Sequence, residues 1–205
     1  MQKNTPIYLD YIYVMDYLKS YASPKSKLTT MIRSGEIIKV RRGLYLRGDD
    51  QTYSLKTLAN KIYGPSYLSF EYALSYHNLI PERVATLTSA SHAKNKTRQF
   101  KTPVGVFVYR SINPNAYPHG IIRIEDADNP FFIAGKEKAL CDTLSKIRGI
   151  TDFKGLEDLL FDDLRLDREE LPGLVLEDIA FLAPLYKKKI LSLLLAYLRQ
   201  EVCHA

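Results

Sequence analysis

Residues 23–47, S-P-K-S-K-L-T-T-M-I-R-S-G-E-I-I-K-V-R-R-G-L-Y-L-R, constrain the fold more than any other stretch of this sequence. Ser23 offers a side-chain oxygen of the kind that caps a helix, and Pro24 fits the first helical position. Gly35 can adopt the left-handed conformation that ends a helix. The stretch therefore begins as a short helix that ends at about residue 34.

A hairpin follows this helix. Residues 36–40 and 44–47 are β-prone runs, and Arg41, Arg42 and Gly43 separate them. Gly43 can take the positive φ that a tight hairpin turn requires. Two arginines at a hairpin tip have no evident folding role, whereas they suit a contact with a nucleic-acid backbone or minor groove. Helix, stop and basic hairpin together predict a winged helix-turn-helix.

The predicted helix has an apolar stripe and a polar face. Leu28, Met31 and Ile32 fall on the buried side at 3.6 residues per turn. The opposite face and its flanks carry hydroxyls and cations: Lys25, Ser26, Lys27, Thr29, Thr30 and Arg33. Such a face can approach base edges and phosphates in a major groove. An ordinary solvated helix has a similar composition, so the helix alone leaves both interpretations open.

Charge is concentrated at the same end of the chain. Residues 23–47 hold seven Lys or Arg against the single acid Glu36, a net charge of +6 that equals that of the whole chain. Of the chain's 29 basic and 23 acidic residues, residues 1–63 hold 11 and 5, which leaves 18 of each elsewhere. This asymmetry indicates an N-terminal DNA-binding end. The hairpin cations expected to anchor the DNA backbone are Lys39, Arg41, Arg42 and Arg47.

The pair Gly64-Pro65 predicts a domain boundary, with a DNA-binding domain over residues 1–63 and a second domain over residues 64–205. The fold class expected is α+β. A winged helix is followed by a mixed α/β domain with a small, mostly antiparallel sheet and a helical C-terminus. In the second domain, periodicity predicts helices over 66–80, 137–148, 156–164, 174–182 and 186–202. It predicts strands over 84–91, 97–101, 106–112, 121–124 and 131–133.

A second, weaker group of cations falls in the predicted strands and the loop before them: Lys94, Lys96, Arg98, Lys101 and Arg110. This possible basic patch could touch nucleic acid. Cations are also common on the solvated face of a sheet, and the pattern favours that interpretation.

Motifs for enzyme chemistry are missing from the sequence. It has no phosphate-binding loop, no dinucleotide fingerprint, no H-E-x-x-H and no G-x-S-x-G. Cys141 and Cys203 form no C-x-x-C pair, and the histidines lack zinc-ligand spacing. We therefore expect no enzyme, no cofactor and no metal. Because the two cysteines indicate no disulfide framework, we expect a cytoplasmic protein. No apolar run is long enough to span a bilayer, so we expect no membrane partner.

Three stretches resemble a known family. The first, residues 23–45, ends in Arg42-Gly43-Leu44-Tyr45. The second consists of Y-L-S-F-E-Y-A-L-S-Y-H-N-L-I-P-E-R-V followed by T-R-Q-F-K-T-P-V-G-V-F-V-Y-R-S-I, and the third is I-A-G-K-E-K-A-L-C-D-T-L. Together they resemble the AbiEi-type antitoxins and related regulators of bacterial phage-defence and type IV toxin–antitoxin operons. The likeness covers roughly residues 20–145, and no motif extends it to the C-terminal part.

The resemblance implies a DNA-binding autorepressor. Its N-terminal winged helix would bind double-stranded operator DNA with inverted repeats upstream of its own operon. Its C-terminal α/β domain would counter a nucleotidyltransferase-like toxin without binding that toxin directly. Two alternatives remain open. One is an antitoxin or protein-interaction module in which DNA binding is secondary, and the other is an unrecognised nuclease or transferase in the second domain.

Overall fold

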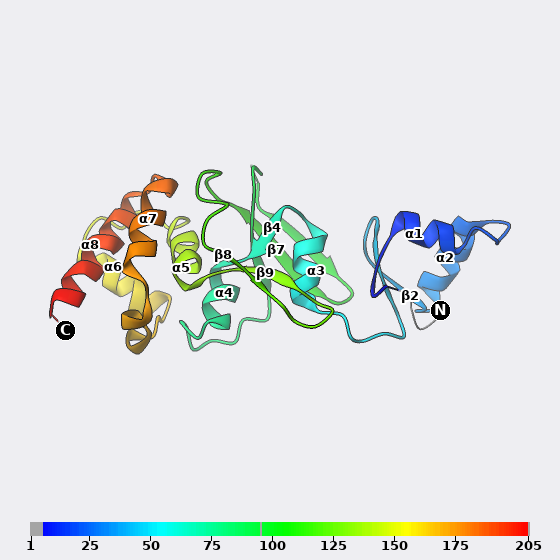
Figure 1. Ribbon diagram of the computed structural model, residues 1–205, viewed down its shortest axis with the longest axis horizontal. Coiled ribbons are helices and arrows are strands. Elements are labelled where there is room, and N and C mark those ends of the chain that lie inside the picture. Colours follow the sequence, from blue (N-terminus) through cyan, green and yellow to red (C-terminus); the bar gives the residue numbers. More distant parts are fainter. Residues whose placement is uncertain (1–5, 95, 205) are drawn as a thin grey trace.

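The computed structural model describes residues 6–94 and 96–204, with side chains described as far as residue 200. The side chain of Cys203 and residues 1–5 of the predicted first domain thus lie outside the described residues. Figure 1 shows an elongated molecule with two N-terminal helices at one end, a six-stranded sheet in the middle and the last helices at the other end. Helices and strands are mixed in one chain with two sheets, which confirms the α+β class.

The N-terminal end is built from three strands and two helices: β1 (Tyr8–Asp10), α1 (Tyr11–Tyr17), α2 (Pro24–Arg33), β2 (Ile37–Arg41) and β3 (Leu44–Arg47). The sheet is antiparallel in the order β1-β3-β2. A small core lies between this sheet and the two helices. Its buried side chains are Leu9, Val14, Leu18, Leu28, Met31, Ile37 and Tyr45.

The ends of α2 follow the sequence closely. Pro24 occupies the first turn, and Gly35 just beyond the helix has φ +79°, as predicted from its position. Ser23 differs from the expectation, because its side chain makes no capping hydrogen bond to the backbone. Its hydroxyl instead donates to the hydroxyl of Ser26 at 2.8 Å.

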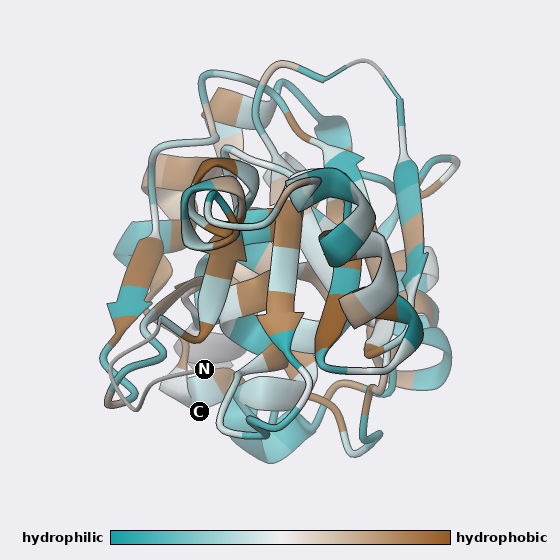
Figure 2. Ribbon diagram, turned by 90° about the vertical axis from the view of Figure 1, so that its right-hand side faces the viewer, coloured by the Kyte–Doolittle hydropathy of each residue, from teal (hydrophilic) through white to brown (hydrophobic). Residues whose placement is uncertain are grey.

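The larger sheet contains β4 (Ser66–Leu68), β5 (Leu87–Ser91), β6 (Arg98–Thr102), β7 (Gly105–Ser111), β8 (Ile121–Ile124) and β9 (Phe131–Ala134). Their order is β6-β7-β5-β4-β9-β8. Three neighbouring pairs are antiparallel, β6–β7, β4–β5 and β8–β9, and two are parallel. Bands of hydrophobic and hydrophilic residues alternate along strands, as the two-residue period of a strand requires (Figure 2).

The start of the predicted helix 66–80 is wrong. Residues 66–68 form the central strand β4, and the helix α4 (Phe70–Tyr76) begins only after Ser69. Every residue of β4 is buried, so this strand shows none of the alternation that marks a half-exposed strand. Phe70 has φ +57°, and this turn in the chain separates strand from helix.

Helix α3 (Leu55–Ile62) packs on the larger sheet. It lies against β4, β5 and β9, and Leu58, Ala59 and Ile62 are buried in the same core as that sheet. The hydroxyl of Tyr109 donates to the carbonyl of Ala59 at 2.6 Å. The predicted boundary at residue 63 assigns α3 to the first domain, whereas α3 packs on the sheet of the second. The boundary itself stays a prediction.

The C-terminal part is helical, as expected. It contains α5 (Lys136–Leu144), α6 (Phe153–Glu157), the π-helical η1 (Asp158–Asp163), the 3-10 helix η2 (Arg168–Gly173), α7 (Leu176–Tyr186) and α8 (Lys189–His204). Helix α5 contacts β9, α4 and α7, and α7 packs on α8. Among the described residues, no helix has the length and apolar character to cross a membrane.

Candidate nucleic-acid interface

The polar face of α2 is open to solvent. Lys25, Ser26, Thr29, Thr30 and Arg33 are all exposed. The hydroxyls of Thr29 and Thr30 donate to the carbonyls of Lys25 and Ser26, at 3.0 and 3.2 Å. These bonds to the preceding turn hold the threonine side chains against the helix, with their methyl groups and oxygen lone pairs on its surface. No residue of α2 is acidic, so this face repels no phosphate.

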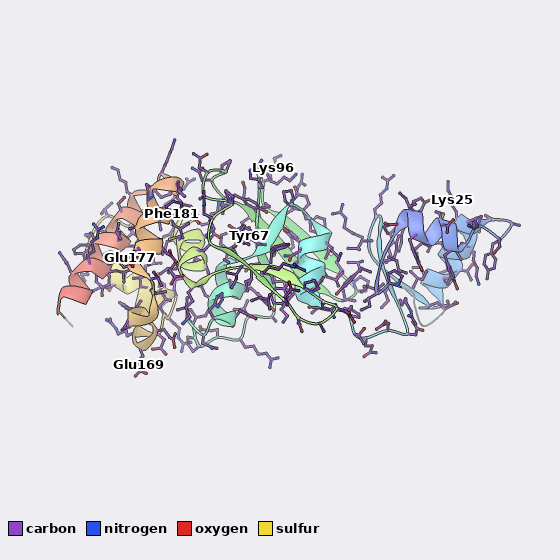
Figure 3. All side chains as sticks on the ribbon, in the orientation of Figure 1. Lys25, Tyr67, Lys96, Glu169, Glu177 and Phe181 are labelled. Atoms are coloured by element: carbon purple, nitrogen blue, oxygen red, sulfur yellow. The ribbon has the colours of Figure 1, made fainter. Side chains whose placement is uncertain are left out.

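Figure 3 places Lys25 near the tip of the molecule, far from the larger sheet. Lys27 lies nearer the core of this end. It is half-buried, and its ammonium stands 5.2 Å from the ring centroid of Tyr21. The ring attracts the ammonium electrostatically and holds it beside Tyr21. On the flanks of α2, Lys25 is therefore exposed, whereas the ammonium of Lys27 contacts the ring of Tyr21.

The hairpin tip has the expected turn. Gly43 adopts φ +85°, and a β-bulge interrupts the pairing between Lys39 and Arg41. Lys39 and Arg42 are exposed, and neither forms an ion pair with a described residue. These two cations are available to an external anion.

Arg41 and Arg47, by contrast, already have partners. Arg41 donates through Nη1 to the carbonyl of Ile62 at the end of α3, and its guanidinium carbon lies 5.5 Å from the ring centroid of Phe100. It therefore ties the hairpin to the larger sheet. Such a position suits a structural anchor better than a DNA contact.

Arg47 is neutralised by a neighbouring carboxylate. Its Nε and Nη2 donate to the two oxygens of Asp49 at 3.1 and 2.8 Å, and only 13% of its side chain is exposed. Hydrogen bonding to Arg47 lowers the pKa of Asp49, because the bond favours the ionised carboxylate. The local charge of the pair is close to zero, so Arg47 adds little attraction for phosphate.

A cation that the sequence did not single out lies beside the hairpin tip. Lys61 on α3 is exposed, with its ammonium 5.1 Å from the ring centroid of Tyr8. A hollow of about 470 Å³ separates Lys61 from the tip residues Arg42 and Gly43. Only the docking of α3 against the hairpin brings these cations together, so no local sequence signal indicates their proximity.

The second predicted basic patch is divided by the sheet. Arg98 pairs with Tyr109 and Lys101 with Val106 in adjacent antiparallel strands. Since side chains alternate between faces, Arg98 lies on the face of Tyr109, whereas Lys101 shares the opposite face with Arg110. Arg110 is also paired with Glu71 at 2.7 Å.

The remaining two cations of that patch lie in the loop before β6. The ammonium of Lys94 is 5.4 Å from the ring centroid of Tyr63, while Lys96 is exposed. Figure 3 shows Lys96 beside the larger sheet, on a different part of the molecule from Lys25. The five cations therefore form no single surface.

Sequence reasoning missed a buried polar cluster around α5. The ammonium of Lys138 lies 3.3 Å from a carboxylate oxygen of Asp142, and both side chains have no exposed area. The carboxylate accepts hydrogen bonds from Ser69 at 2.6 Å, Tyr67 at 3.0 Å and Tyr186 at 2.6 Å. The cluster joins β4, α5 and α7, so it links elements that are distant in sequence.

Burial governs the protonation of this cluster. It lowers the pKa of Lys138, although the charge of Asp142 acts in the opposite direction. It raises the pKa of Tyr67 and Tyr186, and the charge of Asp142 adds to that shift. The tyrosines stay neutral donors to the carboxylate. A signal was present in the sequence, since Lys138 and Asp142 stand one turn apart in a segment whose neighbouring residues Ala139, Leu140, Cys141 and Leu144 are apolar.

Within residues 6–94 and 96–200, no three His, Cys, Asp or Glu side chains gather in an arrangement that could hold a metal ion. His77 donates through Nε2 to the carbonyl of Ala134, 2.7 Å away, in the tautomer that carries its proton on Nε2. No family model and no curated protein matches this sequence.

Proposed function

We propose that the chain is a sequence-specific DNA-binding regulator whose N-terminal end acts as a winged helix-turn-helix. The observation that carries this proposal is the exposed face of α2, rich in hydroxyls and cations, next to a hairpin with two exposed cations, Lys39 and Arg42, that form no ion pair with a described residue. Helix α2 supplies groups that can hydrogen-bond to base edges, and the hairpin supplies contacts to the backbone.

The roles of the ten candidate residues follow from their surroundings. Ser26, Thr29, Thr30 and Arg33 would contact the major groove, with Lys25 and Lys27 at its phosphates. Lys39 and Arg42 would contact the backbone through the wing. We propose that Arg41 positions the wing, because its guanidinium is engaged with Ile62 and Phe100. Arg47 is assigned to the Asp49 ion pair.

The proposal is tested by the salt dependence of DNA binding. Replacement of Lys39 and Arg42 by Ala should lower the affinity for the DNA upstream of the chain's own gene. The slope of log K against log salt should fall by about two units, from roughly 0.9 for each lost phosphate contact. Fluorescence anisotropy between 50 and 200 mM salt measures this slope.

A matched control removes two exposed cations from the other half of the chain, Arg148 and Lys188, and should leave the slope unchanged. A scrambled duplex of the same length separates specific from non-specific affinity. If the Lys39/Arg42 variant keeps the wild-type slope while its circular dichroism is also unchanged, the wing does not contact DNA.

The role as an antitoxin that acts on a nucleotidyltransferase-like toxin rests on the sequence resemblance. One resembling stretch, residues 133–144, folds into β9 and α5, and much of it is buried. This stretch supports a common fold more than a common contact surface. Co-expression of the full chain with a nucleotidyltransferase encoded beside it tests the role. Unrelieved toxicity would leave DNA binding as the sole proposed activity.

A further inference from the structure

A second hollow lies on the larger sheet, away from α2 and the wing. It is bounded by the end of α3, the start of β4, the loop before β8 and the β8–β9 hairpin. Its volume is about 490 Å³, within the roughly 300–1,000 Å³ typical of small-molecule sites. Its polar and aromatic lining residues are Asn60, Ser66, Tyr67, Tyr117, Arg123 and Phe132.

Aromatic rings form most of the apolar lining. The rings of Tyr67 and Tyr117 pack with their centroids 5.1 Å apart, and His92 supports Tyr117 from 4.8 Å. Phe132 contributes a third ring, and this residue is 46% exposed to solvent. The exposed ring of Phe132, next to the packed rings of Tyr67 and Tyr117, is suited to stacking with a planar ligand.

Tyr117 supplies a polar group to the hollow. Burial raises the pKa of Tyr117 to about 12, so its hydroxyl remains a neutral hydrogen-bond donor. Ser66 also borders the hollow, but strand alternation places its side chain on the face of Leu68, opposite the ring of Tyr67. A polar substituent on the ring of a ligand can therefore hydrogen-bond to Tyr117.

One cation stands at the rim. Arg123 lies directly opposite Phe132 in the β8–β9 pair, so their side chains are neighbours on one face. Its guanidinium is 3.0 Å from Glu125, but both side chains are mostly exposed, at 55% and 67%. Exposed pairs of this kind are weak and exchange readily. A phosphate or carboxylate can replace Glu125 and accept two parallel hydrogen bonds.

We infer that this hollow binds a planar aromatic ring that carries an anionic group, and that its occupant is a mononucleotide. The base stacks on the aromatic lining and hydrogen-bonds to Tyr117, and the phosphate binds Arg123. A free aromatic carboxylate has the same chemistry in a smaller molecule. Of the two, a nucleotide makes fuller use of a hollow of this size.

Isothermal titration calorimetry of the full chain without DNA tests the inference independently of the proposed DNA binding. The probes are AMP, GMP, CMP and UMP, each to 1 mM. Adenosine, ribose 5-phosphate and salicylate separate the contributions of ring, phosphate and carboxylate. We expect at least one nucleotide to bind at least tenfold more tightly than each of these three compounds, because stacking and the charged contact act together.

Two variants locate the site. Arg123→Gln should weaken the bound nucleotide about tenfold and leave the weak binding of its nucleoside unchanged. Phe132→Ala should weaken nucleotide and nucleoside alike. Arg83→Gln, which removes an exposed arginine elsewhere, is the matched control and should change neither.

Three results would overturn the inference. The first is that none of the four nucleotides binds at 1 mM. The second is that ribose 5-phosphate or salicylate binds as tightly as the best nucleotide. The third is that nucleotide binding persists at full strength in both the Arg123 and the Phe132 variants.

Discussion

Removal of the carboxylate from the buried Lys138–Asp142 pair should destabilise the fold strongly. Asp142→Asn keeps the volume of the side chain but leaves the ammonium of Lys138 without its counter-charge. Lys138 then keeps the carbonyl of Ala116 and the hydroxyl of Tyr186, each at 2.6 Å, and the rings of Tyr67 and Tyr186, none of which carries a full negative charge. Breaking a buried pair on one side typically costs about 3–5 kcal/mol. For a chain of this size, the midpoint of thermal unfolding should fall by roughly 6–20 °C.

Urea denaturation followed by circular dichroism measures this loss, and α1 provides a control. Asp16 and Lys19 form an ion pair at 3.0 Å with nearly the same sequence spacing, yet both side chains are mostly exposed. Asp16→Asn should therefore change the free energy of unfolding little. Lys138→Met combined with Asp142→Asn should cost less than the sum of the single changes, because the two groups are directly coupled.

If Asp142→Asn costs no more than Asp16→Asn, then water reaches the Lys138 ammonium, or the buried pair contributes no more than a surface ion pair. Either result contradicts the expected loss of stability. Additive single changes in the double variant would contradict the direct coupling in the same way.

Two further predictions concern alkaline stability and backbone packing. Burial raises the pKa of the Cys141 thiol to about 12. Since the unfolded thiol ionises near its ordinary value, stability should fall as pH rises from about 9 to 12, by about 4 kcal/mol in all from this group. The pKa of Lys138 is lowered, so its ionisation makes stability rise with pH until the ordinary pKa of lysine is reached. Cys141→Ala should flatten the fall between pH 9 and 10 in urea midpoints, and equal slopes would contradict the assignment. In the N-terminal sheet, a Cβ on Gly48 would lie 1.6 Å from the carbonyl oxygen of Gly35, whereas Gly43 has open space but φ +85°. Gly48→Ala should therefore cost about 3 kcal/mol and Gly43→Ala about 1–2 kcal/mol in thermal unfolding, and the reverse order would contradict this argument.

The local structure of the N-terminal end was predictable from the sequence. Pro24 and Gly35 bound α2, and Gly43 turns the hairpin, because each residue has a backbone preference that acts over a few neighbours. Leu28 and Met31 are buried at the helical spacing. The same reasoning failed at β4, a three-residue strand that is buried throughout and shows no period.

The state of each candidate side chain was decided by the tertiary structure. The sequence presents Lys39, Arg41, Arg42 and Arg47 as equivalent hairpin cations. The fold leaves Lys39 and Arg42 exposed. Arg41 donates a hydrogen bond to the carbonyl of Ile62, and Arg47 forms an ion pair with Asp49. The partner of Arg41 comes from another element, so no local pattern could indicate it.

The pattern of charge along the chain determined which end of this protein is basic, and local backbone preferences determined the helix and hairpin that carry the charge. Only the tertiary structure decided which cations remain free, that the second basic group is divided between two faces of a sheet, and that Lys138 and Asp142 are buried together. Backbone preferences act between neighbours in the chain. Burial, desolvation and ion pairing act between neighbours in space, and these are set only when the strands and helices pack.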